Sequence, residues 1–159
     1  MKIREFKDSD LEQMCRIWNE IVNEGNAFPQ EDPLSIESAR EFFERQSFTG
    51  VARIKDEIVG LYILHPNNVG RCSHIANASY AVSSLFRGKH IGEKLVRHSL
   101  KKAKELDFLI LQYNAVVEDN CPARHLYEKI GFKQLGTIPK GFRLKNGEYV
   151  NICPYYIEI

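Results

Sequence analysis

The stretch that decides the fold is Arg87-Gly88-Lys89-His90-Ile91-Gly92, which joins a strand-like run to an amphipathic helix. Residues 75–82, just before it, read IANASYAV and are rich in strand-forming and small side chains. After it, apolar or small residues recur every three or four positions, at Ile91, Leu95, Val96, Ser99, Leu100, Ala103 and Leu106. A basic turn that opens a helix directs unpaired N–H groups and the positive end of the helix dipole at one place. This arrangement suits a phosphate, and an ordinary strand-to-helix turn is the alternative.

Size and composition indicate one globular domain over residues 1–159. Of the 159 residues 43% are apolar and 27% charged, which is ordinary for a protein with a full core. The net charge of +1 gives no reason to expect a nucleic-acid partner. The amino terminus lacks the apolar segment of a signal peptide, and no apolar run approaches membrane-spanning length. We therefore expect a soluble cytoplasmic protein that has no membrane partner.

The four cysteines give no sign of a metal site. Cys15, Cys72, Cys121 and Cys153 are far apart and form no Cys/His ligand spacing. Dispersed thiols fit a reducing compartment, although one disulfide stays open as an alternative. We expect no metal.

The patterns along the chain predict an α/β (α+β) fold with a mixed, largely antiparallel sheet of about seven strands and helices on both faces. Asp8–Asp10 is expected to cap a helix that Gly25 ends, Ser35 to cap a second one, and 118–120 to cap a helix that Gly131 ends. Asn146-Gly147 predicts a hairpin turn, and Pro154 a bulge or an edge position in the last strand. The expected strands are 2–7, 50–54, 58–64, 73–82, 108–117, 132–138 and 149–159.

A second motif begins about thirty residues after the turn and reads Asn120-x-x-Ala123-x-x-Leu126-Tyr127-Glu128-Lys129-Ile130-Gly131-Phe132. In combination with Arg87-x-x-His90-x-Gly92, and in this order of elements, it resembles the GNAT superfamily of acyl-CoA-dependent N-acetyltransferases. The resemblance covers essentially the whole chain.

The resemblance implies acetyl-CoA as the co-substrate. Its pantetheine arm would run along the strand near Val82, Asn120 would meet the pantetheine or phosphate region, and the hydroxyl of Tyr127 would approach the thioester sulfur. The strand-edge N–H of Val82 could stabilise the oxyanion of acyl transfer, and a phenol could protonate the departing thiolate. A core tyrosine is the alternative for Tyr127. The pyrophosphate would lie on the turn formed by Arg87, Gly88, Lys89, His90, Ile91, Gly92 and Glu93.

Two positions depart from the family pattern. His90 stands where glycine is usual, so its Cβ lies near the expected pyrophosphate, and the position can demand a special backbone angle. A hydrogen bond from His90 to a phosphate and a tolerated surface histidine are the two alternatives. Ser84 replaces a proline that is common there.

On the acceptor side, residues 18–28 and 33–35 resemble the phosphinothricin-acetyltransferase-like branch, which acetylates the α-amino group of small amino acids. The resemblance makes Phe28, expected to be exposed in a loop, and Glu24 candidates for contact with the acceptor. Arg71 and His74 are candidates for holding its carboxylate. Asn77 is a further candidate for binding the acceptor. It occupies the place where the branch usually has a carboxylate base, so Glu24, His74 or an ordered water is left as the base.

The sequence thus predicts transfer of an acetyl group from acetyl-CoA to a primary amine of a small amino-acid-like acceptor by direct attack. Two alternatives are an enzyme that acetylates a protein or peptide amine and a CoA-binding module without turnover. The apolar last strand, residues 149–159, could pair across a homodimer, and burial within its own sheet is the simpler alternative.

Overall fold

The computed structural model describes all 159 residues, which form one eight-stranded sheet in the order β1-β2-β3-β4-β5-β8-β6, with β7 paired to β8. Only β4 and β5 run parallel. The strands are β1 (Lys2–Glu5), β2 (Phe48–Ile54), β3 (Glu57–Pro66), β4 (Ile75–Val82), β5 (Ile110–Val117), β6 (Lys133–Gln134), β7 (Ile138–Arg143) and β8 (Tyr149–Glu158). The helices are α1 (Leu11–Glu24), α2 (Ile36–Glu44), α3 (Ile91–Glu105) and α4 (Cys121–Ile130), with short 3-10 turns η1 (Asp8–Asp10), η2 (Gly70–Cys72) and η3 (Ser84–Phe86).

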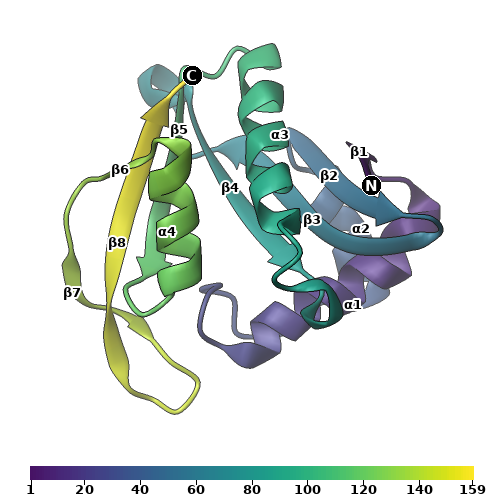
Figure 1. Ribbon diagram of the computed structural model, residues 1–159, viewed down its shortest axis with the longest axis horizontal. Helices are drawn as coiled ribbons and strands as arrows, with labels where there is room; N and C mark the ends of the chain where they lie inside the picture. The colour runs from purple at the N-terminus through teal and green to yellow at the C-terminus, as the bar shows by residue number, and fades with distance from the viewer.

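The helices cover both faces of the sheet, as expected. Figure 1 shows α3 and α4 in front of the sheet and α1 and α2 behind it. Two cores follow from this layering, one of 16 buried residues that includes Leu95, Leu111 and Tyr155, and one of 15 centred on Trp18 and Phe43. None of the helices combines the length and the apolar character that a membrane span requires.

Most of the predicted helix ends are confirmed. Gly25 closes α1 at a left-handed φ of 65°, and Gly131 closes α4 at 115°. The Ser35 side chain accepts a hydrogen bond from the Ser38 N–H at the start of α2, and Asn120 caps α4. Asp10 behaves differently: it stands at the N-cap of α1 but makes no side-chain cap bond to that helix. Its carboxylate accepts from the Lys7 N–H before η1 and pairs with Arg4 of β1.

The carboxy-terminal part differs from the prediction in its number of strands. The expected strand 132–138 is split into β6 and β7, because Gly136 at φ 151° interrupts it and each piece pairs separately with β8. The hairpin at Asn146-Gly147 is confirmed, with Gly147 at φ 89°. Pro154 lies in β8 opposite the irregularity of β5 between Tyr113 and Val116, as the bulge prediction requires. β8 lies inside its own sheet, so its apolar residues do not argue for a dimer.

The parallel strands β4 and β5 are paired over a short distance only. Ile75 lies opposite Ile110 and Ala76 opposite Leu111, and no register pair follows. Beyond Ala76 the two strands diverge toward their carboxyl ends, where α3 and α4 begin (Figure 1). The sheet is therefore split at the edge where open α/β sheets place their ligands.

Candidate functional site

The turn before α3 presents seven successive N–H groups that donate no hydrogen bond within the protein, from Arg87 through Glu93. Gly88 has a φ of 77° and His90 a φ of 58°, so left-handed residues alternate with ordinary ones along the turn. Such alternation curls successive amides around a common point, which makes an anion-binding concavity. The positive end of the α3 dipole adds to the same place.

His90 adopts the special backbone angle that its position was expected to demand. It is the N-cap residue of α3 at φ 58° and ψ 20°, in the left-handed region where glycine is unstrained. Its side chain is 78% exposed, and Nδ1 lies 4.0 Å from the Glu93 carboxylate. The imidazole therefore stands outside the turn.

The carboxylate of Glu93 links α3 to α4. It accepts hydrogen bonds from Arg97 at 2.9 and 3.1 Å and from Lys129 at 2.8 Å. The hydrogen bonds from Lys129 and Arg97 lower the pKa of Glu93. Its contribution to the turn is thus confined to its free N–H, since the carboxylate is already neutralised.

Val82 presents a free strand edge to the split between β4 and β5. Val82 lies opposite Gly60 in the pairing of β4 with β3. Because the Ser83 N–H donates to the Val59 carbonyl, Val82 and Gly60 form a non-hydrogen-bonded pair. In an antiparallel ladder such a residue directs its N–H and C=O away from that partner. Both groups of Val82 therefore point toward β5, which has already diverged.

Tyr127 of α4 lies beside the same split. Its ring packs against Tyr113 and Phe132 with centroids 4.5 and 5.6 Å apart. The hydroxyls of Tyr80 and Tyr113 bond to each other at 2.8 Å, but the hydroxyl of Tyr127 has no partner. Since no buried side-chain oxygen in the protein lacks a partner, this hydroxyl is not fully enclosed. Burial raises the pKa of Tyr127 well above its usual value, so it stays protonated at neutral pH.

Asn120 is the N-cap residue of α4, and α4 begins at the same edge of the sheet as α3 (Figure 1). Its side-chain oxygen accepts from the Ala123 N–H at 3.3 Å, and its backbone carbonyl accepts from Arg124. The side-chain oxygen is thus engaged in capping, whereas its NH₂ donates no bond in the protein and is available to a ligand.

Glu24 does not lie where the acceptor was expected. Its Oε1 is 2.5 Å from Nη2 of Arg87, so an ion pair joins the last turn of α1 to the turn before α3. One turn earlier, Glu20 accepts a bond from the Ser84 N–H at 3.1 Å. The prediction of Glu24 as a general base loses its geometric support, because its carboxylate is paired with Arg87 of the turn before α3.

The opposite face of the sheet carries a cleft of about 610 Å³ between α1, α2 and β4. Phe28, expected to be exposed, is buried against Trp18 with ring centroids 4.4 Å apart, because this loop folds over α1. It still forms part of the cleft wall. Aromatic and aliphatic side chains share the lining with polar and charged ones, and the lining residues are Trp18, Phe28, Pro29, Gln30, Leu34, Ser38, Glu41, Phe42, Arg45 and Ser79.

Asn77 lies at the point where β4 and β5 separate. Its Nδ2 donates to the Gln112 carbonyl at 3.0 Å, which bridges the two strands where their own ladder ends. Ser79, two residues further along β4, shares its side of the sheet and lines the cleft. Asn77 thus fixes the point at which β4 and β5 separate.

Arg71 and His74 are not brought to this place. Both are exposed and lie in or beside η2, before β4 starts. His74 precedes Val82 by eight positions, which at about 3.3 Å per residue separates them by roughly 26 Å along the strand. Their predicted contact with an acceptor carboxylate is not supported by the geometry.

Several cleft residues were missed by reasoning from the sequence. The rings of Trp18 and Phe42 lie 5.2 Å apart in the cleft wall, where Trp18 also donates a hydrogen bond to Gln30 at 2.8 Å. Glu41 and Arg45 lie one turn apart on α2 and both line the cleft. The i, i+4 spacing of opposite charges next to an aromatic residue was the available signal, and it is equally typical of a solvated helix face.

A turn of free N–H groups beside a split mixed sheet defines a class of α/β protein that holds a phosphate-bearing ligand at the split. Residues 11–132 match the sequence profile described as the acetyltransferase (GNAT) family, and the chain belongs to this family.

Individual relatives agree with the family assignment. The chain is 35% identical over 102 residues to the N-acetyltransferase aca1 of Schizosaccharomyces pombe, covering 64% of this chain and 49% of that protein. It is 32% identical over 110 residues to the L-amino acid N-acetyltransferase AaaT of Escherichia coli, covering 67% and 64%. The chain thus spans about half of the length of the first relative and just under two thirds of the length of the second. A GCN5-related N-acetyltransferase from Kribbella flavida superposes with a TM-score of 0.90 at 29% identity, covering 99% of this chain and 97% of that one.

Proposed function

We propose that the protein transfers the acetyl group of acetyl-CoA to the primary amine of an amino-acid-like acceptor. The observation that carries the proposal is the run of unpaired N–H groups from Arg87 to Glu93 beside the free edge of Val82 and the open hydroxyl of Tyr127. Membership of the acetyltransferase (GNAT) family supports it.

The residues present fit the co-substrate. A pyrophosphate needs several converging donors without nearby carboxylates, and the free N–H groups supply them while Glu93 and Glu24 are held by cations. A pantetheine chain carries amides, which the unpaired backbone of β4 can meet as an added strand would. The thioester supplies an activated acetyl group, and the residues of the split would orient it.

Two groups would act on the reacting atoms. The N–H of Val82 points into the split and would donate to the oxygen that becomes negative when an amine attacks. Tyr127 would donate a hydrogen bond to the sulfur that leaves. Because its pKa is raised and a thiol titrates near ~8.5, full proton transfer would be uphill, so hydrogen bonding is the better role for the phenol.

The cleft of about 610 Å³ would take the acceptor from the other face of the sheet. Its aromatic walls favour an apolar side chain, Arg45 offers a partner for a carboxylate, and Glu41 is the only carboxylate in the lining. Glu41 would therefore hold the ammonium group and take its proton directly or through water. The similarity to an L-amino acid N-acetyltransferase supports this acceptor class.

The test is a thiol-release assay with acetyl-CoA and a panel of amines, with products verified by mass spectrometry. We expect free amino acids with apolar or aromatic side chains to give the highest kcat/KM, and the corresponding amino-acid amides to be poorer because they lack the carboxylate. Preference for peptides would overturn the acceptor class. Calorimetry with desulfo-CoA tests the other half of the site, and absence of binding would overturn the whole proposal.

A further inference from the structure

A second cleft lies at the free edge of the sheet, away from the proposed acetyl-transfer site. It measures about 470 Å³ and lies between β1, the segment that follows it, and the end of β2. β1 is the outermost strand, and β2 and β3 separate it from β4. Five of its six lining residues carry a positive charge, and the lining consists of Met1, Lys2, Arg4, Lys7, Arg53 and Lys55.

The strand register forces these charges together. Lys2 lies directly opposite Arg53 in the antiparallel pairing of β1 and β2. Like charges in directly opposed positions destabilise a strand pair. Lys55 follows two residues later in the tight turn before β3, at a φ of 53° that favours glycine or asparagine. The edge therefore concentrates cations where charge repulsion and backbone preference both oppose them.

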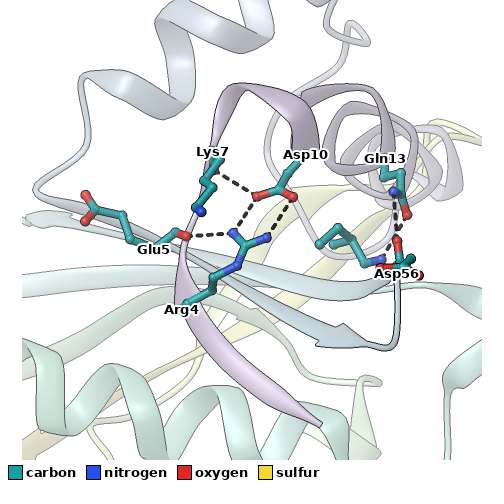
Figure 2. A network of polar contacts seen from close by, with 7 residues as sticks. Arg4, Glu5, Lys7, Asp10, Gln13 and Asp56 are labelled. Carbon is teal, nitrogen blue, oxygen red and sulfur yellow. Dashed lines mark hydrogen bonds and ion pairs between the residues drawn. The ribbon is translucent and has the colours of Figure 1, made fainter.

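The protein's own carboxylates compensate only part of this charge. Asp10 pairs with Arg4 through contacts of 2.6 and 3.0 Å, and Figure 2 shows the carboxylate of Glu5 pointing away from that pair. Asp56 pairs with Arg53. These two carboxylates face five cationic side chains, so an excess of three positive charges is left. Lys2, Lys7 and Lys55 take part in no ion pair.

Burial of Asp10 opposes its ionisation, but hydrogen bonds from Arg4 and the Lys7 N–H, with the nearby charge of Arg53, outweigh it and lower the pKa of Asp10. The Arg4 guanidinium is consequently fixed, with both terminal nitrogens engaged (Figure 2). The unpaired ammonium groups of Lys2, Lys7 and Lys55 therefore line the same cleft as this fixed guanidinium.

We propose that this cleft binds the phosphate groups of a small di- or polyphosphate. The volume matches a small-molecule site rather than an extended surface, and three uncompensated lysines match an anion of high charge density. The lining contains no aromatic ring on which a nucleobase could stack, so recognition would depend on the phosphates alone. The proposal is independent of the acetyl-transfer site, since it shares no residue with it.

The test is isothermal calorimetry of the untagged chain with inorganic pyrophosphate, in the presence of saturating CoA to block the turn before α3. We expect binding that weakens as salt is added and that is at least ten-fold weaker in the double variant Lys2→Gln/Lys55→Gln. The matched control is Lys101→Gln/Lys104→Gln, which removes two exposed lysines of α3 and should bind as the parent does. ADP should bind no more than about three-fold tighter than pyrophosphate.

Three outcomes would overturn the proposal: no heat under these conditions, equal loss in the control variant, or tighter binding of duplex DNA or an acidic peptide through Lys2 and Lys55. Both substituted side chains are exposed, and thermal melting of each variant verifies folding. Acetyl transfer by Lys2→Gln/Lys55→Gln should match the parent, so failure of this proposal is distinguishable from failure of the proposed function.

Discussion

Oε1 of Glu24 and Nη2 of Arg87 lie 2.5 Å apart although 63 positions separate them in the sequence. The pair joins the end of α1, which leads into the wall of the large cleft, to the turn whose N–H groups are free. With the bond from the Ser84 N–H to Glu20, it gives the two halves of the proposed site a direct connection.

The pair predicts the behaviour of Glu24→Gln. Both side chains are more than a third exposed, so the contact is worth about 0.2–1 kcal/mol. We expect kcat to stay within about two-fold and the KM for acetyl-CoA to change by no more than about five-fold. Glu12→Gln, also on α1, is the control. A kcat lower by two orders of magnitude would restore Glu24 as the base.

Tyr127→Phe removes the unpartnered hydroxyl while keeping the ring packed against Tyr113. Loss of one donor at a reacting atom lowers kcat about 10²–10³-fold, and the affinity for desulfo-CoA should change little. Because the pKa of Tyr127 is raised, the parent enzyme should show no bend from this residue in its pH–rate profile below pH 10. Unchanged turnover would remove Tyr127 from the mechanism.

The variant Arg45→Gln tests binding of the acceptor separately from binding of the co-substrate. The guanidinium lies 5.4 Å from the Phe42 ring and lines the cleft, so its loss should raise the KM of carboxylate-bearing acceptors at least ten-fold. The KM for acetyl-CoA should be unaffected. Acceptors without a carboxylate provide the internal control, and an equal rise for them would show that the variant disturbs the cleft itself.

His90→Gly relieves a left-handed backbone that costs about 1 kcal/mol for a residue with a Cβ. Part of the gain is offset because glycine gains more freedom in the unfolded chain. We expect the free energy of unfolding to change by less than about 1 kcal/mol and the affinity for desulfo-CoA to be retained. A large loss of affinity would assign the imidazole a direct contact with phosphate.

Asp10→Asn breaks a largely buried ion pair with Arg4, whose side chains are only 7% and 19% exposed. At pH 7 this should cost about 3 kcal/mol in urea unfolding. The pKa of Asp10 is lowered from 3.8, so the stabilisation is fully present above about pH 4 and is lost as the pH falls through the folded value. The difference between parent and variant should therefore shrink at pH 3.

The elements that sequence reasoning located depend on local chemistry. Gly25 and Gly131 end helices because glycine accepts a left-handed φ, and Ser35 and Asn120 begin them through their own side chains. The sequence did not predict the break between β6 and β7, because the place where a strand ends depends on the strand that it pairs with. Here that partner is β8, which comes later in the chain.

The same distinction applies to the site. The turn from Arg87 to Glu93 is contiguous, so its pattern was visible in the sequence. The cleft brings together Trp18, Phe28, Arg45 and Ser79 from four segments. The resemblance of residues 18–28 pointed to the first two, but no local pattern in the sequence predicts that Arg45 and Ser79 lie beside them. The ion pair of Glu24 could not be predicted from its neighbours in the sequence, because its partner Arg87 lies 63 positions further along the chain.

The divergence of β4 from β5 leaves the cleft and the N–H turn on different elements of the fold, joined through the pair of Glu24 and Arg87. The cleft is built from α1, α2 and their connecting loop with only Ser79 from the sheet, whereas the N–H turn and Tyr127 belong to α3 and α4. Laboratory selection for new acceptors should therefore accumulate substitutions between Phe28 and Arg45. The turn from Arg87 to Glu93 would pass through such selection unaltered.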